Sequence, residues 1–181
     1  TDQGCLPLAL HPVMTFTGTS IDLNRLSACP FGITTVQTLR PVAETLVVEI
    51  GGEPIWVPEE NRGLYHAALT FGANNLMTLV TQTTELLEAA GITNPENLVA
   101  PLLGASLDNA LRNGDAAITG PVARGDAGTV REHLRVLANF DPAVSQAYRA
   151  MARLTAIRAL ASGTLQPQLA EELLIVLADE S

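Results

Sequence analysis

The sequence lacks lysine altogether, so each of its ten basic residues is an arginine. These arginines are outnumbered by 19 acidic residues, which gives a formal net charge of −9 at pH 7 and a pI near 4.6. Binding to nucleic acid or to an anionic membrane surface depends on a cluster of basic residues, and the sequence contains none. We therefore expect no nucleic acid and no membrane among the partners of this chain.

Charged residues of both signs are scarce, since they make up 16% of the chain against 47% for the hydrophobic residues. This composition excludes a disordered chain, and 181 residues are enough for one well-buried core or two small ones. The longest uncharged run, 63–84, contains a histidine, amides and threonines, and so predicts a buried helix rather than a membrane span. The chain has no signal-peptide pattern and no CxxC pair, which predicts a cytoplasmic protein with reduced cysteines.

The first third of the chain has the pattern of an α/β layer. Short apolar runs rich in β-branched and aromatic residues predict strands at 6–10, 31–36 and 54–57. Between the last two, Pro41 at a first turn and the Gly51-Gly52 stop predict a helix over 41–50. This strand, helix, strand order indicates that the last two strands are parallel.

Beyond Pro58 the strand signals vanish and the pattern becomes helical. We predict helices over 58–91, 95–112, 127–139, 142–161 and 168–178, with glycine, proline or asparagine between them. The expected fold is therefore an α/β fragment over residues 1–58, the end portion of a Rossmann-like sheet, followed by an all-α domain over 59–181. The helix over 58–91 is apolar nearly all round, so it lies at the centre of the all-α domain or is covered by a second subunit. We expect a homodimer.

Several common cofactor and metal motifs are missing. No two glycines stand two residues apart, so there is no Gly-x-Gly-x-x-Gly turn for a dinucleotide. Gly120 and Gly125 have phosphate-loop spacing, but the next residues are not the lysine and hydroxyl residue that such a loop requires. The three histidines lie far apart in sequence and no cysteine pair joins them, so we predict no metal site. Of the three, His133 is most simply a helix-surface residue.

His11 directly follows an apolar strand and precedes a proline that turns the chain. Ligands of open α/β sheets bind beyond the carboxyl ends of strands, where an imidazole can act as acid, base or hydrogen-bond donor. The alternative is a histidine that caps the strand end by bonding to backbone.

His66, Thr70 and Asn74 step by four residues along the long helix and therefore share one face. They line a cleft beside the α/β layer, or they form an internal polar seam bonded to a neighbouring helix.

The segment 119–126 (TGPVARGD) joins two predicted helices. Gly120 and Gly125 allow the backbone to approach a ligand, Arg124 offers a bidentate fork for an anion, and Asp126 can cap the following helix. The alternative is a purely structural turn in which Arg124 pairs with an acid.

Three segments together resemble the family of Rossmann-like proteins with a DUF2520 C-terminal domain: LALHPVMTF (8–16), LYHAALTFGANNL (64–76) and LRNGDAAITGPVARGD (111–126). The last segment is the most specific, and the resemblance covers the chain from about Leu6 to Leu165. The architecture of these proteins is similar to that of the 6-phosphogluconate dehydrogenase-like superfamily. In that superfamily a dinucleotide domain precedes an all-α domain that dimerises and closes the active cleft.

The resemblance implies an NAD(P)-dependent oxidoreductase that works as a homodimer. In the family a glycine-rich loop precedes the His-Pro segment, and this chain matches only the part that follows the loop. We therefore expect a fragment or a natural remnant of a longer protein, which by itself binds neither NAD nor NADP.

His11-Pro12 also resembles the His-Pro-Met segment of prephenate dehydrogenases, whose histidine bonds the substrate hydroxyl during hydride transfer. The hydroxyacid dehydrogenases of the superfamily act on substrate with a lysine, and with an asparagine four residues later on the long helix. The matching helix of this chain has no lysine. The catalytic candidates are His11, His66 and Asn74, and the substrate-binding candidates are Arg124, Thr70 and Gly120.

Two functions are consistent with these features. The first is the substrate-binding and dimerisation part of an NAD(P)-dependent dehydrogenase for a small anionic metabolite. The second is a non-catalytic helical module for dimerisation or ligand sensing, which kept the fold and lost the chemistry.

Overall fold

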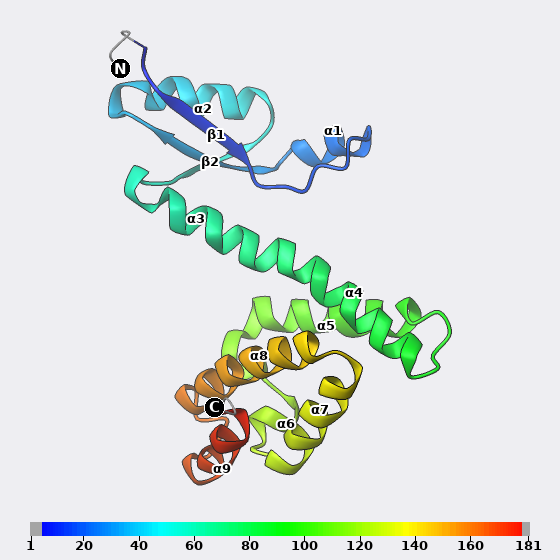
Figure 1. Cartoon of the computed structure of the whole chain (residues 1–181). Helices are drawn as coiled ribbons and strands as arrows, with labels where there is room; N and C mark the ends of the chain where they lie inside the picture. Colours follow the sequence, from blue (N-terminus) through cyan, green and yellow to red (C-terminus); the bar gives the residue numbers. More distant parts are fainter. Residues whose placement is uncertain (1–4, 179–181) are drawn as a thin grey trace. The chain divides into compact units, whose positions relative to one another are not determined.

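The computed structural model describes residues 5–178, which divide into two compact units (Figure 1). The first unit ends at Met77 and the second begins at Thr78. The last strand ends at Trp56, close to the predicted boundary at residue 58. The first unit extends beyond this boundary, to Met77, because the first turns of the long helix pack against the sheet.

A three-stranded sheet organises the first unit, with strands β1 (Leu8–Pro12), β2 (Pro30–Thr35) and β3 (Glu53–Trp56) in the order β1-β2-β3. The strands β2 and β3 are parallel, which confirms the prediction from their strand, helix, strand order. The strand β1 is antiparallel to β2. It also runs two residues further than predicted, so it includes His11 and Pro12, and proline is tolerated at a sheet edge.

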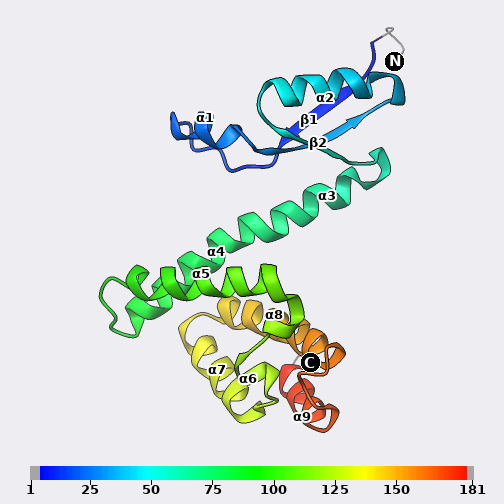
Figure 2. The same ribbon diagram turned by 180° about the vertical axis from the view of Figure 1, so that it is seen from behind.

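The helix α2 (Arg40–Glu49) connects β2 to β3 and covers one face of the sheet (Figures 1 and 2). Alternate residues of β2, Phe31 and Ile33, form a buried core with Ala43 and Val47 of α2. Cys29 belongs to this core, as expected of a packing residue, whereas Cys5 is exposed. The opposite face of the sheet therefore remains available to other residues.

A short helix, α1 (Ile21–Leu26), was not expected from the sequence. Its Asp22 is buried, and the carboxylate accepts hydrogen bonds from the backbone N–H groups of Thr17 and Gly18 at 2.8 Å each. Burial is the largest single influence on the pKa of Asp22 and raises it. The hydrogen bonds to the carboxylate together outweigh burial, so the pKa is lower than usual. The carboxylate thus organises the loop that leads into α1.

The long helix forms as predicted, and it contains one irregular turn. It consists of η2 (Glu59–Asn61), α3 (Arg62–Leu69), the π-helical turn η3 (Thr70–Asn74) and α4 (Asn75–Ala89). Within the π turn the N–H of Asn75 donates to the carbonyl of Thr70, five residues back. Such turns are rare and occur frequently at functional sites.

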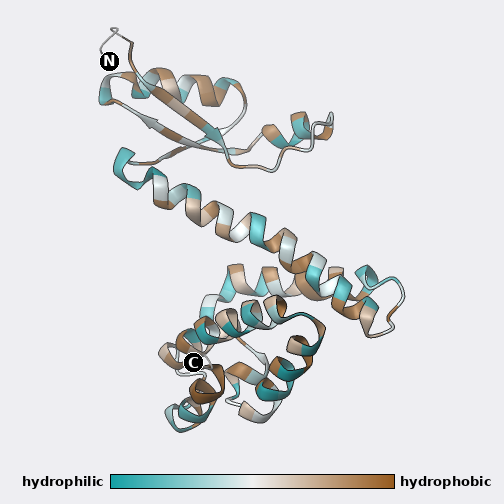
Figure 3. Cartoon of the chain, in the orientation of Figure 1, coloured by the Kyte–Doolittle hydropathy of each residue, from teal (hydrophilic) through white to brown (hydrophobic). Residues whose placement is uncertain are grey.

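The prediction that the long helix is buried is wrong for the single chain. None of the residues of α3, η3 or α4 is buried, and the side chains of Leu64, Phe71 and Met77 are 74%, 59% and 69% exposed. Hydrophobic residues alternate with polar ones along the whole helix (Figure 3). The alternative that the helix lies at the centre of an all-α domain is therefore excluded for the chain by itself.

The second unit contains the predicted helices α5 (Glu96–Asn113), α7 (Ala127–Phe140), α8 (Pro142–Ala161) and α9 (Pro167–Leu177). The segment between α5 and α7 is more structured than a plain loop, because it contains the short turns η4 (Gly114–Ala117) and α6 (Gly120–Ala123). In the part of the chain that the structure describes, no helix is long and apolar enough to cross a membrane.

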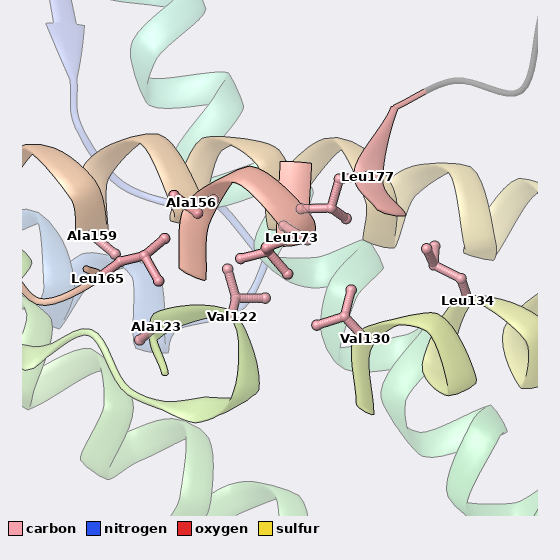
Figure 4. Close-up of a cluster of buried hydrophobic side chains, with 11 residues drawn as sticks. Val122, Ala123, Val130, Leu134, Ala156, Ala159, Leu165, Leu173 and Leu177 are labelled. Atoms are coloured by element: carbon pink, nitrogen blue, oxygen red, sulfur yellow. The ribbon is translucent and has the colours of Figure 1, made fainter. Parts of the chain in front are cut away.

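The core of the second unit lies between α6, α7, α8 and α9 (Figure 4). Leu173 and Leu177 of α9 face Val122 and Val130, and all four are buried. The side chain of Arg149 on α8 donates to the carbonyls of Val176 and Ala178 at 3.0 and 2.7 Å, which satisfies carbonyl groups at the end of α9.

Candidate functional site

A pocket of about 590 Å³ lies on the face of the sheet opposite α2, within the first unit. Its volume is within the range of small-molecule sites. We call it the sheet pocket. It is lined by residues of β1, β2 and α3 and their flanks: Leu8, Ala9, Leu10, His11, Gly32, Thr34, Val57, Arg62, Gly63, Tyr65 and His66.

His11 reaches this pocket from a strand face and not, as predicted, from the carboxyl edge of the sheet. Because β1 is antiparallel to β2, its carboxyl end lies beside the amino end of β2, where Pro12 pairs with Phe31. His11 pairs with Gly32, one pair before the end of this ladder, and the two residues lie on the same face of the sheet. The histidine is therefore part of the sheet face that lies under α3.

Tyr65 of α3 closes over this surface and is a site residue that the sequence analysis missed. A Cβ atom at position 32 would lie 2.3 Å from the Tyr65 hydroxyl oxygen and 2.7 Å from its Cζ. Only glycine at position 32 therefore allows the tyrosine ring to lie directly on β2. A glycine in a strand interior is itself a sign of such a close approach, and it was the available signal.

The hydroxyl of Tyr65 lies 2.9 Å from Nδ1 of His11, with the two rings in a T-shaped arrangement. Burial, and secondarily the electrostatic effect of Cys29, raise the pKa of Tyr65, so its phenol stays protonated at neutral pH. When this phenol donates a hydrogen bond to Nδ1, a neutral His11 carries its own proton on Nε2. The pair thus presents an N–H donor to the pocket.

His66 approaches the same surface from α3. Its ring centroid lies 6.5 Å from that of His11, so the two imidazoles that the sequence singled out do come together. Arg62, one turn earlier, adds a cation to the lining, and its guanidinium is 3.2 Å from the carboxylate of Glu59. Both groups of this ion pair are mostly exposed, so it leaves Arg62 able to exchange partners.

Thr70 and Asn74 do not line the sheet pocket. They lie in the π turn, one and two turns beyond His66, and both are exposed. Eight residues of helix correspond to about 12 Å along the axis, so a shared helix face is not a shared site. The catalytic role predicted for Asn74 and the substrate contact predicted for Thr70 remain predictions.

The segment 119–126 lies in the second unit, and the structure shows why some of its residues are of the type found there. Asp126 caps α7 as predicted, because its carboxylate accepts the N–H of Thr129 at 3.0 Å, which lowers the pKa of Asp126. Close packing requires glycine at position 125, because a Cβ atom there would lie 2.5 Å from Cβ of Leu169. Gly120 has a positive φ of 92° and open space around it.

Arg124 is exposed. Among the described residues it takes part in no ion pair within 4.0 Å, although its charge contributes to the low pKa of Asp126. The alternative in which Arg124 is occupied by an acid therefore has no support, and its predicted role as an anion receptor stays open.

The residues present do not fit a dinucleotide. The connection from β2 to α2, which is the strand, turn, helix element of this chain, reads Val36, Gln37, Thr38, Leu39 and contains no glycine. A pyrophosphate needs glycine there for the backbone to approach it. In residues 5–178 no three histidine, cysteine or acidic side chains are grouped closely enough to hold a metal ion.

Residues 29–155 match the family model described as domain of unknown function DUF2520. The chain belongs to the DUF2520 family. The match runs from the start of β2 to the last turns of α8 and includes Tyr65, His66 and Arg124, whereas His11 lies before it. No match was found among curated proteins.

Two solved structures share the fold of this DUF2520 chain. Protein TM1727 from Thermotoga maritima is 23% identical, with a TM-score of 0.71 over 86% of this chain and 62% of its own. A protein from Bacteroides fragilis named "putative NADP oxidoreductase BF3122" is 24% identical, with a TM-score of 0.69 over 85% of this chain and 59% of its own. The DUF2520 chain thus spans about three fifths of the length of either relative. Both likenesses confirm the predicted fold class.

Proposed function

We propose that this chain supplies the substrate-binding and dimerisation part of an NAD(P)-dependent oxidoreductase that acts on a small anionic metabolite in the cytoplasm. The family is oxidoreductase-like, as the name of the Bacteroides fragilis relative indicates. The observation that carries the proposal is the cluster of His11, Tyr65 and His66 around one pocket. Two imidazoles and a phenol within one small volume are groups that bind and move a proton on a substrate oxygen.

Each residue of the cluster has a distinct task in this proposal. Nε2 of His11 donates to a substrate oxygen, and Tyr65 fixes the tautomer that makes this possible. His66 exchanges a proton with the same oxygen, since the two rings are close enough for one small molecule to touch both. Arg62, which lines the same pocket, receives the anionic group of the substrate, and Arg124 and Gly120 keep their predicted role in substrate binding within the second unit. A nicotinamide cofactor would supply the hydride chemistry and would be held by residues other than these.

Proton NMR of the histidine rings tests the site, because the chain has only three histidines. Addition of oxalate, as an unreactive analogue of a small 2-oxo or 2-hydroxy carboxylate, is expected to shift the ring signals of His11 and His66. The signal of His133, in the second unit, is the internal control. Arg62→Gln is expected to weaken the binding about tenfold, since it removes a charge-assisted bond from the pocket lining.

The matched control is Arg112→Gln, which changes an exposed arginine whose partner is Asp108 on its own helix. It should leave the oxalate affinity unchanged. If no carboxylate shifts His11 or His66 in the wild-type chain, the sheet pocket is not the substrate site, and the non-catalytic module becomes the better account.

Light scattering is expected to give a mass of twice 19.1 kDa at micromolar concentration. The reason is the exposed apolar side of the long helix, since burial of such a surface contributes about 25 cal/mol per Å². Phe71→Glu, at a residue 59% exposed, should convert the dimer to a monomer. Val48→Glu on α2, at a residue 57% exposed, should leave the mass unchanged. A single 19.1 kDa species of the wild-type chain would contradict the proposed homodimer.

A further inference from the structure

A second pocket, of about 300 Å³, lies wholly within the second unit and is separate from the sheet pocket. We call it the helix pocket. One part of its lining comes from Thr119, Pro121 and Val122, around the start of α6. Its other walls are His133 of α7 and one stripe of α8, which consists of Tyr148, Met151, Ala152 and Thr155. Most of these side chains are apolar.

A histidine and tyrosine pair lies at the edge of this apolar surface. Nδ1 of His133 is 2.9 Å from the hydroxyl oxygen of Tyr148, and the rings are T-shaped at 5.7 Å. Burial raises the pKa of Tyr148, so the phenol stays protonated at neutral pH and can donate to Nδ1 of a neutral His133. The pair then offers Nε2–H of His133 as a donor and the Tyr148 oxygen as an acceptor.

The charged groups near His133 balance one another. Glu132 forms an ion pair with Arg135 at 2.6 Å, and the carboxylate of Asp126 is held by Thr129 and influenced by Arg124. When the ring of His133 is protonated, its positive charge also lowers the pKa of the Asp126 and Glu132 carboxyl groups. Among the described residues no arginine lines the helix pocket, whereas Arg62 lines the sheet pocket, and this difference distinguishes the helix pocket from the site proposed above for an anionic substrate.

The size of the pocket, its largely apolar surface and the histidine and tyrosine pair define the ligand class. A pocket of about 300 Å³ is at the lower end of small-molecule sites and accommodates roughly one ring with a short substituent. One donor and one adjacent acceptor match a hydroxyl group, which needs both. We propose that the helix pocket binds an uncharged, mostly apolar molecule of about one ring that bears a single hydroxyl group.

NMR of methyl-labelled methionine in the full chain tests this with cyclohexanol as the probe. The chain has three methionines, and of these only Met151 lines the helix pocket. The Met151 signal should shift and saturate, whereas those of Met14 and Met77 should not move. Cyclohexanecarboxylate should bind several-fold more weakly than cyclohexanol, because no arginine within residues 5–178 lines the helix pocket to stabilise its charge.

Two variants assign the contacts. Tyr148→Phe removes only the hydroxyl and should weaken cyclohexanol binding about two- to tenfold. The matched control is Tyr65→Phe, which breaks the other histidine and tyrosine pair, in the first unit, and should leave this affinity unchanged. Thr155→Phe fills the pocket from its rim and should abolish the Met151 shift.

Three results would overturn the inference. The first is a Met151 signal that fails to saturate with cyclohexanol, and the second is a Thr155→Phe chain that still binds it. The third is tighter binding of the carboxylate than of the alcohol, which would assign an anion to the pocket. A far-ultraviolet circular dichroism spectrum equal to that of the wild-type chain shows for each variant that the helices of the second unit are retained, so a lost response is not caused by unfolding. The oxalate experiment on the sheet pocket is independent of all three.

Discussion

Replacement of Leu173 by alanine is expected to lower the free energy of unfolding of the second unit by about 2–5 kcal/mol. Leu173 is 0% exposed and lies in the middle of the cluster that joins α6, α7, α8 and α9. Truncation of the side chain removes buried carbons, so the free energy gained by their transfer out of water is lost. It also leaves a cavity, because the four packed helices cannot move enough to fill it.

The neighbouring Leu174 is the matched control, because it is 39% exposed and loses less buried surface when it is shortened to alanine. Its replacement should cost less than half as much as that of Leu173. Urea unfolding followed by far-ultraviolet circular dichroism reports mainly on the helices. Trp56, the only tryptophan, reports on the first unit by fluorescence. Equal losses for the two leucine variants would contradict the observed core.

Gly125→Ala should destabilise the second unit more than Gly120→Ala, although both glycines belong to the same segment and both have positive φ. At Gly120 a Cβ meets open space, so the cost is only that of the backbone conformation, about 1 kcal/mol. At Gly125 the Cβ would lie 2.5 Å from Cβ of Leu169, which is fixed to the α9 backbone. Overpacking of this kind adds about 1–3 kcal/mol.

The difference between the two glycine variants isolates the contact with α9 from the backbone effect. Urea midpoints of both variants, with circular dichroism as the signal, give this difference directly. A Gly120→Ala loss equal to that of Gly125→Ala would mean that α9 moves aside at no cost. Gly120→Ala is also expected to retain the Gly125 packing, so it is suitable for testing the proposed substrate contact of Gly120 in a folded chain.

The sequence predicted those elements whose ends are marked by local chemistry. Prolines and glycines define the limits of α2, α8 and α9, and Asp126 marks the start of α7. The helix α1 was missed because it has only six residues and no periodic apolar face, and α6 because its four residues lie in a segment rich in turn formers. Local rules thus recover long helices and fail for single turns.

The candidate site was only partly predictable, for a different reason. His11 and His66 could be predicted because each belongs to an element that is recognisable in the sequence. His11 lies near the end of a strand, and His66 lies in the long helix. Tyr65 was missed because its role depends on Gly32, which is distant in sequence and near only in the folded unit. The direction of β1 could not be predicted either, since a strand pattern is the same for parallel and antiparallel pairing.

The π turn at Thr70–Asn74 sets the rotational phase of the long helix. It accommodates one residue more than an α-helical turn, so every side chain after Asn75 points about 100° away from its direction in an uninterrupted α-helix. A relative with one residue fewer at this point would therefore keep the sequence of α4 and turn a different stripe of it outward. Alignments of the family that place a gap elsewhere in this helix would compare residues from different faces, and a residue count between His66 and α4 is the simplest guard against that error.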